Sequence, residues 1–202
     1  MNLFTNLAWY RFVEIDNPRS IRPPLLDYCL KLSIKGTILL SAEGININIV
    51  GLEKSIQKLI KYLEADNRFK DIEAKITYST YQPFTRMLVK VKREIIAIHN
   101  PEIQPSRFTG PKIQAKELHD LYEAGEDFTI LDTRNDFEIR LGRFKDSIDV
   151  GLNHFSEFPT AIKNLDKSLK SNPLVMYCTG GIRCEKASAA MLDAGFKKGY
   201  QL

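Results

Sequence analysis

Hydrophobic and polar residues follow two different periods in the first half of the chain. Alternation with a period of two, or a β-branched and aromatic composition, predicts strands over residues 7–15, 36–41, 45–50, 69–78 and 87–98. Helices are predicted from about Pro23 to Leu32 and, by the helical spacing of its apolar residues, over 52–63. Within 45–50 the isoleucines are expected to face a core and the asparagines the opposite side. The order of these elements, with one extra strand, is the pattern of a ferredoxin-like α+β domain.

In the second half of the chain, short apolar runs alternate with helical stretches. Strands are predicted over 128–131 and 174–177, and helices over 115–124, 155–169 with a break at Pro159, and 185–194. Strands that alternate with helices predict a parallel sheet in an α/β fold. Sites in such sheets form at the carboxyl ends of the strands. Cys178 lies at such a position, directly after the strand predicted over 174–177.

Prolines mark the boundary between these halves. The stretch 99–111 holds Pro101, Pro105, Pro111 and Gly110, and it is predicted to link a domain over 1–98 to a domain over 112–202. The last four residues, 199–202, have the composition of a strand that has just begun. We therefore expect the C-terminal end of the second domain to be truncated.

The composition is that of a globular protein, with 44% hydrophobic and 27% charged residues. No apolar run has the length of a membrane span, and the N-terminus lacks the basic and small-residue pattern of a signal peptide. Two of the three cysteines, Cys178 and Cys184, share one short segment, which argues against a disulfide framework and favours a reducing cytoplasm. The third, Cys29, lies among apolar residues of a predicted helix and is expected to pack in a core.

Positive charge is concentrated in the first half of the chain. Residues 1–100 hold 15 Lys and Arg against 10 Asp and Glu, whereas residues 101–202 hold 14 against 15. Four of the basic residues follow one predicted strand and are candidates for contacts to the phosphates of a nucleic acid: Arg86, Lys90, Lys92 and Arg93. A basic face that merely contacts solvent is the alternative interpretation, and the sequence leaves both open.

Cys178 stands between a predicted buried strand and a predicted helix. The intervening residues are Thr179, Gly180, Gly181 and Ile182. Backbone N–H groups of such a loop, with the positive end of the helix, form a cradle for an anion. We therefore expect Cys178 to have a lowered pKa and to be a thiolate at neutral pH, with Arg183 adding a fixed positive charge. A cysteine that merely fills a core would fit poorly beside two glycines and an arginine.

The length of this loop separates two chemistries. Four residues lie between Cys178 and Arg183. Cysteine phosphatases use a longer loop, which encircles a tetrahedral phosphate. The shorter loop resembles that of rhodanese sulfurtransferases, which holds a sulfane sulfur on the cysteine.

Two neighbouring features have competing interpretations. Cys184 is a candidate resolving thiol for Cys178, and it is equally a small buried residue in the first helical turn. Its spacing from Cys178 matches no zinc motif, so no metal site is expected. Asp132 follows a predicted strand and is interpreted as structural support, with Arg134 expected to pair with Glu138.

Several motifs together resemble a family. A rhodanese domain is indicated by Ile130 to Arg134, Phe137-Glu138, Gly142 to Phe144 and Cys178 to Ala187. The rhodanese-containing tRNA uridine hydroxylases of bacteria are indicated further by Ala42 to Asn46, by Leu88 to Ile96 and by the cysteine loop with Cys184. The chain departs from the family pattern at Ile47-Asn48, where Gly-Thr is usual, and it lacks the family's cysteine-containing tail.

The resemblance implies an acylphosphatase-like N-terminal domain and oxygen-dependent formation of 5-hydroxyuridine at the wobble position of tRNA. Cys178 is then the catalytic cysteine, acting through a persulfide-type state with Arg183 beside it. Molecular oxygen is the co-substrate, no other cofactor is evident, and the partners are the anticodon region of tRNA and a sulfur donor. The alternatives are a sulfurtransferase that passes sulfane sulfur from thiosulfate or a persulfide to a thiol, and a sulfur-carrying or RNA-binding module without catalysis.

Overall fold

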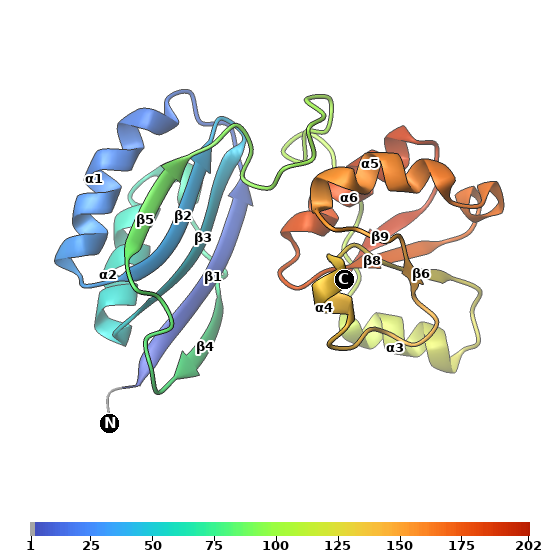
Figure 1. The fold of residues 1–202 in the computed structure, drawn as a ribbon, viewed down its shortest axis with the longest axis horizontal. Helices are drawn as coiled ribbons and strands as arrows, with labels where there is room; N and C mark the ends of the chain where they lie inside the picture. The colour runs from blue at the N-terminus through green and yellow to red at the C-terminus, as the bar shows by residue number, and fades with distance from the viewer. Residues whose placement is uncertain (1–2) are drawn as a thin grey trace. The chain divides into compact units, whose positions relative to one another are not determined.

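The computed structural model describes residues 3–202 and divides the chain into two compact units, with the division between Ile95 and Ile96. Each unit has its own sheet and is described by itself (Figure 1). The predicted fold class is confirmed, because the first unit is an α+β unit and the second an α/β unit with a parallel sheet. None of the helices over residues 3–202 combines the length and hydrophobicity that crossing a bilayer requires.

The first unit contains one five-stranded sheet. Its elements are β1 (Phe4–Phe12), α1 (Pro18–Lys31), β2 (Lys35–Ser41), β3 (Gly44–Gly51), α2 (Glu53–Glu64), the 3-10 turn η1 (Asn67–Phe69), β4 (Lys75–Ser79) and β5 (Met87–Val91). The strand order is β4-β1-β3-β2-β5, with β5 parallel to β2 and the other pairs antiparallel. The first four strands of this order give the ferredoxin-like topology, and β5 is the extra strand.

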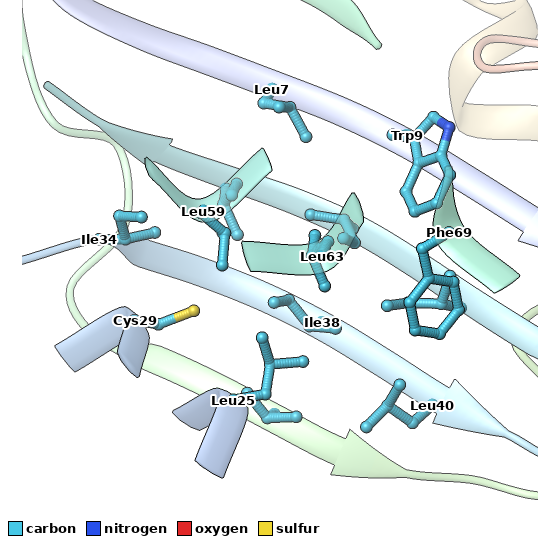
Figure 2. Close-up of a cluster of buried hydrophobic side chains, with 14 of the residues drawn as sticks. Leu7, Trp9, Leu25, Cys29, Ile34, Ile38, Leu40, Leu59, Leu63 and Phe69 are labelled. Carbon is cyan, nitrogen blue, oxygen red and sulfur yellow. The ribbon is translucent and has the colours of Figure 1, made fainter. Parts of the chain in front are cut away.

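Both long helices of this unit cover the same face of the sheet (Figure 1). Alternate strand residues point toward them, so that Trp9 and Ile38 share a core with Cys29 of α1 and Leu59 of α2 (Figure 2). Each such side chain, fully buried, contributes about 1.5–3 kcal/mol relative to exposure. The isoleucines of β3 are buried in this core and Asn48 is exposed, as their alternation predicted.

Two predicted strands of the first unit are shorter than expected. The strand predicted over 87–98 ends at Val91, because the Ile95 N–H donates to the side-chain carboxylate of Glu43 at 2.7 Å and the chain leaves the ladder. The strand predicted over 69–78 forms only from Lys75. Phe69 instead closes a 3-10 turn and is buried.

The second unit contains a four-stranded parallel sheet in the order β7-β6-β8-β9. Its elements are α3 (Ala115–Glu123), β6 (Thr129–Asp132), α4 (Asp136–Ile139), β7 (Ile148–Asp149), η2 (Phe155–Glu157), α5 (Phe158–Ala161), η3 (Ile162–Asn164), η4 (Lys167–Lys170), β8 (Leu174–Tyr177), α6 (Ile182–Asp193) and β9 (Gly199–Gln201). The helix predicted over 155–169 is a series of short turns. Asp166 interrupts it by accepting the N–H of Ser168 and starting η4.

Side chains of β6 and β8 alternate between two cores. Leu131 and Met176 lie in one core with Met191 of α6, whereas Val175 lies in the other with Leu118 of α3. Helices therefore cover both faces of the sheet, and β8 is a central strand buried along its whole length. Its carboxyl end is the position from which the cysteine loop begins.

The stretch predicted to link the domains packs within the second unit. Ile98 and Ile103 are buried in the same core as α6. The Gly110 N–H donates to Ser188 Oγ at 2.9 Å, and the Gln201 N–H donates to the Pro111 carbonyl at 2.9 Å. These contacts hold residues 110–111 against α6 and against β9, the last strand of the sheet.

Candidate active site

Cys178 lies in the loop between the end of β8 at Tyr177 and the start of α6 at Ile182. The helix begins three residues earlier than predicted, so the turn is tight. Gly181, the residue before the helix, has φ +91°, which a side chain would strain. This conformation aims its N–H at the Cys178 sulfur, to which it donates at 3.0 Å.

Cys178 is partly exposed, and its surroundings favour the thiolate. A hydrogen bond from the Cys184 side chain is the largest cause, and together with the Arg183 charge and the N–H groups of Cys184 and Gly180 it lowers the pKa of Cys178 to about 5. Burial alone would raise this pKa, so the loop donors outweigh desolvation. At neutral pH the group is a thiolate.

Cys184 is fully buried in the first turn of α6 and faces Cys178. The hydrogen bond to Cys178 and burial raise the pKa of Cys184 well above that of an ordinary thiol, so it keeps its proton. Thr133 Oγ1 lies 3.8 Å from the Cys184 sulfur and donates to the Tyr177 carbonyl at 2.9 Å. The two cysteines therefore form an unequal pair, a thiolate beside a thiol.

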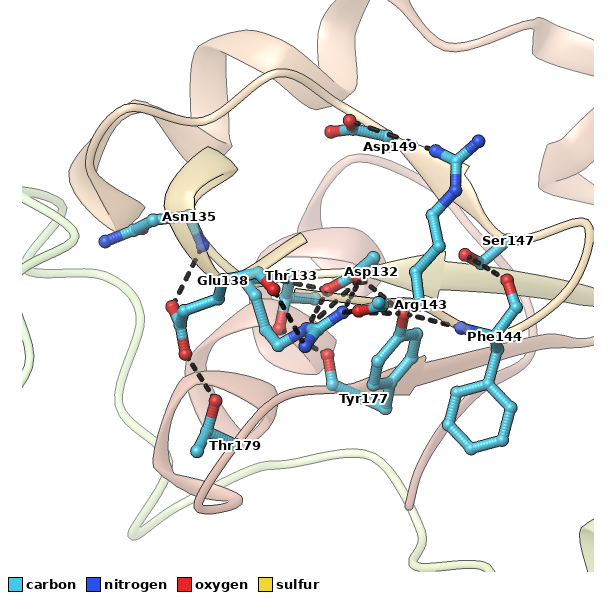
Figure 3. A network of polar contacts seen from close by, with 12 residues as sticks. Asp132, Thr133, Asn135, Glu138, Arg143, Phe144, Ser147, Asp149, Tyr177 and Thr179 are labelled. Carbon is cyan, nitrogen blue, oxygen red and sulfur yellow. Dashed lines mark hydrogen bonds and ion pairs between the residues drawn. The ribbon is translucent and has the colours of Figure 1, made fainter. Parts of the chain in front are cut away.

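Arg183 is held by a carboxylate from another element. Its Nη1 and Nη2 donate to the Glu138 carboxylate at 2.5 Å and 2.8 Å, and both side chains are nearly buried. The Thr179 hydroxyl also donates to Glu138 (Figure 3). These hydrogen bonds lower the pKa of Glu138 to about 2, and the bond from Arg183 has the largest effect. Burial acts in the opposite direction and is outweighed.

The expectation that Arg134 pairs with the Glu138 carboxylate is wrong. Arg134 reaches only the Glu138 backbone carbonyl, at 3.5 Å, and its guanidinium pairs with the side chain of Asp132 instead. Glu138 is the third residue of α4, and its side chain accepts the Asn135 N–H at 3.2 Å as a helix cap. This cap leaves the carboxylate pointing at the cysteine loop.

A largely buried network adjoins the loop (Figure 3). Asp132 is fully buried and accepts the Arg134 N–H at 3.0 Å and its side chain at 2.7 Å and 3.0 Å. The Tyr177 hydroxyl donates to the same carboxylate and accepts the Phe144 N–H at 3.2 Å. Because Tyr177 precedes Cys178, the network fixes the end of β8 and agrees with the structural role expected for Asp132.

The structure distributes the predicted site residues over both units. The cysteine loop lies in the second unit, with Thr179 exposed and Gly180, Gly181 and Ile182 partly exposed. The basic residues Arg86, Lys90, Lys92 and Arg93 are exposed in the first unit. No local sequence signal indicates that Glu138 contacts the loop, because its partners Thr179 and Arg183 are 41 and 45 residues away along the chain.

Alkylation of Cys178 by iodoacetamide is expected to follow a pH profile with its midpoint near 5, because the thiolate is the nucleophile and its pKa is about 5. The reaction should therefore be fast at pH 6, where an ordinary thiol with a pKa of about 8.5 is almost wholly protonated. Peptide mass spectrometry after timed quenching measures this rate. Cys29 is the internal control, since burial raises its pKa to about 12. A midpoint for Cys178 above about 8 would contradict the assignment.

Comparison with known proteins assigns both units. Residues 4–95 match the UPF0176 acylphosphatase like domain, and residues 114–202 match the rhodanese-like domain. A tRNA uridine(34) hydroxylase of Bordetella parapertussis is 40% identical over 202 residues, which cover 100% of this chain and 84% of that relative. Proteins of the same description from Variovorax paradoxus and Cupriavidus necator are 42% and 41% identical, covering 100% and 98% of this chain and 79% and 72% of the relatives.

Proposed function

Because this chain belongs to the family of tRNA uridine(34) hydroxylases, we propose that it hydroxylates the wobble uridine of tRNA to 5-hydroxyuridine. Molecular oxygen supplies the inserted atom. The observation that carries the proposal is the similarity over the whole chain, which includes both the acylphosphatase-like and the rhodanese-like unit. A match to the rhodanese-like unit alone would favour sulfur transfer equally well.

In this proposal Cys178 is the catalytic residue. Its thiolate is the most nucleophilic group of the loop, and N–H donors hold its charge without solvent reorganisation. A sulfane sulfur delivered by a donor would convert it to a persulfide, which the same donors can stabilise. Arg183 contributes positive charge to the sulfur while its orientation is fixed by Glu138.

Cys184 has the position of a resolving thiol. Insertion of one atom of dioxygen into a C–H bond requires two electrons, which reduce the second oxygen atom to water. Joining the Cys178 thiolate to the Cys184 thiol in a disulfide releases two electrons and one proton, and solvent supplies the second proton. This step would balance the hydroxylation of one uridine, and an external thiol would reduce the disulfide again before the next turnover.

The proposed partner is the anticodon region of tRNA, and the proposed location is the cytoplasm, where tRNA and reduced thiols coexist. The exposed basic residues of the first unit, Arg86, Lys90, Lys92 and Arg93, are the candidates for phosphate contacts. A sulfur donor is part of the proposal if the persulfide is an intermediate.

The proposal predicts that this chain restores 5-hydroxyuridine to the tRNA of cells that lack their own hydroxylase gene. Nucleoside mass spectrometry on purified tRNA measures the product, with the empty vector as the control. No 5-hydroxyuridine with the protein expressed and folded would overturn the proposal. A thiosulfate:cyanide sulfur-transfer rate that tRNA does not affect would then favour the sulfurtransferase.

A further inference from the structure

One face of the first sheet carries no helix among residues 3–95. We call the side facing away from α1 and α2 the open face (Figure 1). The strand register places Tyr10, Asn46, Leu39 and Lys90 side by side in one row across it. A second row, Ala8, Asn48, Thr37 and Leu88, lies beside the first. The intervening row, which includes Trp9 and Ile47, points into the helix-covered core.

An aromatic pair stands on this face. Tyr10 and Phe12 are two residues apart on β1, so both rings project from the same side of the sheet, and both are partly exposed. Their centroids are 6.0 Å apart and their planes are inclined by 70°. Aromatic rings presented on a sheet are the surface on which proteins stack unpaired nucleobases.

Amide groups lie next to these rings. Asn46 is the cross-strand neighbour of Tyr10, and its carbonyl accepts a hydrogen bond from the exposed Asn48 side chain at 3.1 Å. Asn46 in turn donates to the Ile95 carbonyl at 3.3 Å. Two ordered amides beside a ring provide hydrogen-bonding groups for the edge of a stacked base.

Positive charge borders the open face on both outer strands. On β5, alternation places the exposed Lys90 on this face, with Arg86 and Lys92 following the same alternation beyond the strand ends. On β4, at the other edge, the exposed Lys75 pairs with Ala8 and so shares the face. The cations on the outer strands can contact phosphates, and the rings on β1 can stack against unpaired bases.

We propose that the open face binds about two or three unpaired nucleotides of RNA, with bases stacked on Tyr10 and Phe12 and phosphates against the β5 edge. Identifying this RNA as the anticodon loop of tRNA rests on the proposed function. The surface distinguishes single strands from duplex RNA, because paired bases are already stacked and cannot lie on the rings.

The test is a fluorescence-anisotropy titration of the full chain with a labelled anticodon stem-loop RNA. Changing both rings to leucine (Tyr10→Leu with Phe12→Leu) keeps the face apolar and should weaken binding roughly 5- to 100-fold, the range for loss of base stacking. Tyr10→Phe should bind like the wild type, since it keeps the ring. Changing the stacked pair Tyr28 and Tyr62, which lies on the helices, to leucine is the matched control and should leave affinity unchanged.

A second variant separates stacking from charge. Changing Arg86, Lys90, Lys92 and Arg93 to glutamine should reduce the dependence of affinity on salt concentration, whereas the ring variant should leave that dependence as it is.

The inference would be overturned if the ring variant bound the stem-loop as tightly as the wild type does. It would also be overturned if the wild type bound duplex RNA as tightly as the stem-loop. If the ring variant binds normally while the wild type makes 5-hydroxyuridine, only this inference fails. If stem-loop binding requires the rings but no 5-hydroxyuridine forms, only the proposed function fails.

Discussion

Replacing Cys178 with serine is expected to abolish 5-hydroxyuridine formation, with a loss of rate on the order of 10³-fold or more. Serine keeps the size of the side chain, but its hydroxyl stays protonated at neutral pH and cannot carry a sulfane sulfur or join a disulfide. The N–H of Gly181 and the side chain of Cys184 would then surround a neutral group. Nucleoside mass spectrometry of tRNA, together with the rate of the purified enzyme, measures the effect.

Two further substitutions make this result specific. Cys29→Ala removes a thiol from the core of the first unit and should keep most of the activity. Cys184→Ser should allow no turnover if Cys184 is the resolving thiol, because the two electrons that each hydroxylation requires come from joining Cys184 to Cys178. A Cys178→Ser enzyme with a tenth of the wild-type rate would exclude Cys178 as the reactive group.

Replacing Asp132 with alanine is expected to lower the free energy of unfolding of the second unit by about 3–5 kcal/mol, the cost of removing one partner of a buried ion pair. Asp132 has no exposed surface, and its carboxylate holds both the Arg134 guanidinium and the Tyr177 hydroxyl. Without it, the nearly buried Arg134 guanidinium loses its carboxylate partner and keeps only contacts to backbone carbonyls and the Tyr177 hydroxyl, and that hydroxyl loses its acceptor. Urea unfolding followed by far-UV circular dichroism measures the change.

The chain offers two controls for this experiment. Its single tryptophan, Trp9, lies in the first unit, so fluorescence follows that unit separately. Tyr177→Phe removes the hydroxyl that bonds to Asp132, Phe144 and Arg134 but leaves the ion pair intact, so it should cost about 0.5–1.5 kcal/mol for each hydrogen bond lost. A loss below about 1 kcal/mol for Asp132→Ala would contradict the supporting role of the network.

The local features of the site were predictable because their signals are contiguous. The apolar run 174–177, the two glycines and the helix formers after Cys184 together specify a strand, a tight turn and a helix. The same holds for the alternation of β3, in which each isoleucine is buried and its asparagine neighbours are not. Both predictions depend only on information that is local in the sequence: hydrophobic periodicity, which reports the buried face, and residue types that favour turns or helices.

Contacts between distant residues were not predictable in this way. The strand β5 ends early because of Glu43, whose side chain is 52 residues away from Ile95 along the chain. The partner of Glu138 is Arg183, whereas Arg134, only four residues before Glu138 along the chain, pairs with Asp132. Carboxylates and guanidinium groups are equally compatible with many partners, so the tertiary fold decides which pairs form.

The pairing of Arg183 with Glu138 determines the net charge that an incoming reactant meets. The thiolate of Cys178 and the carboxylate of Glu138 are negative and Arg183 is positive, so the three groups together carry one unit of negative charge. Another anion, such as thiosulfate, would meet repulsion of about 4 kcal/mol from one such charge 4 Å away at an effective dielectric constant of about 20. Dioxygen is neutral and meets no such barrier. The formal charges of these three groups therefore favour neutral reactants, whereas the N–H groups of the loop act in the opposite direction by attracting anions.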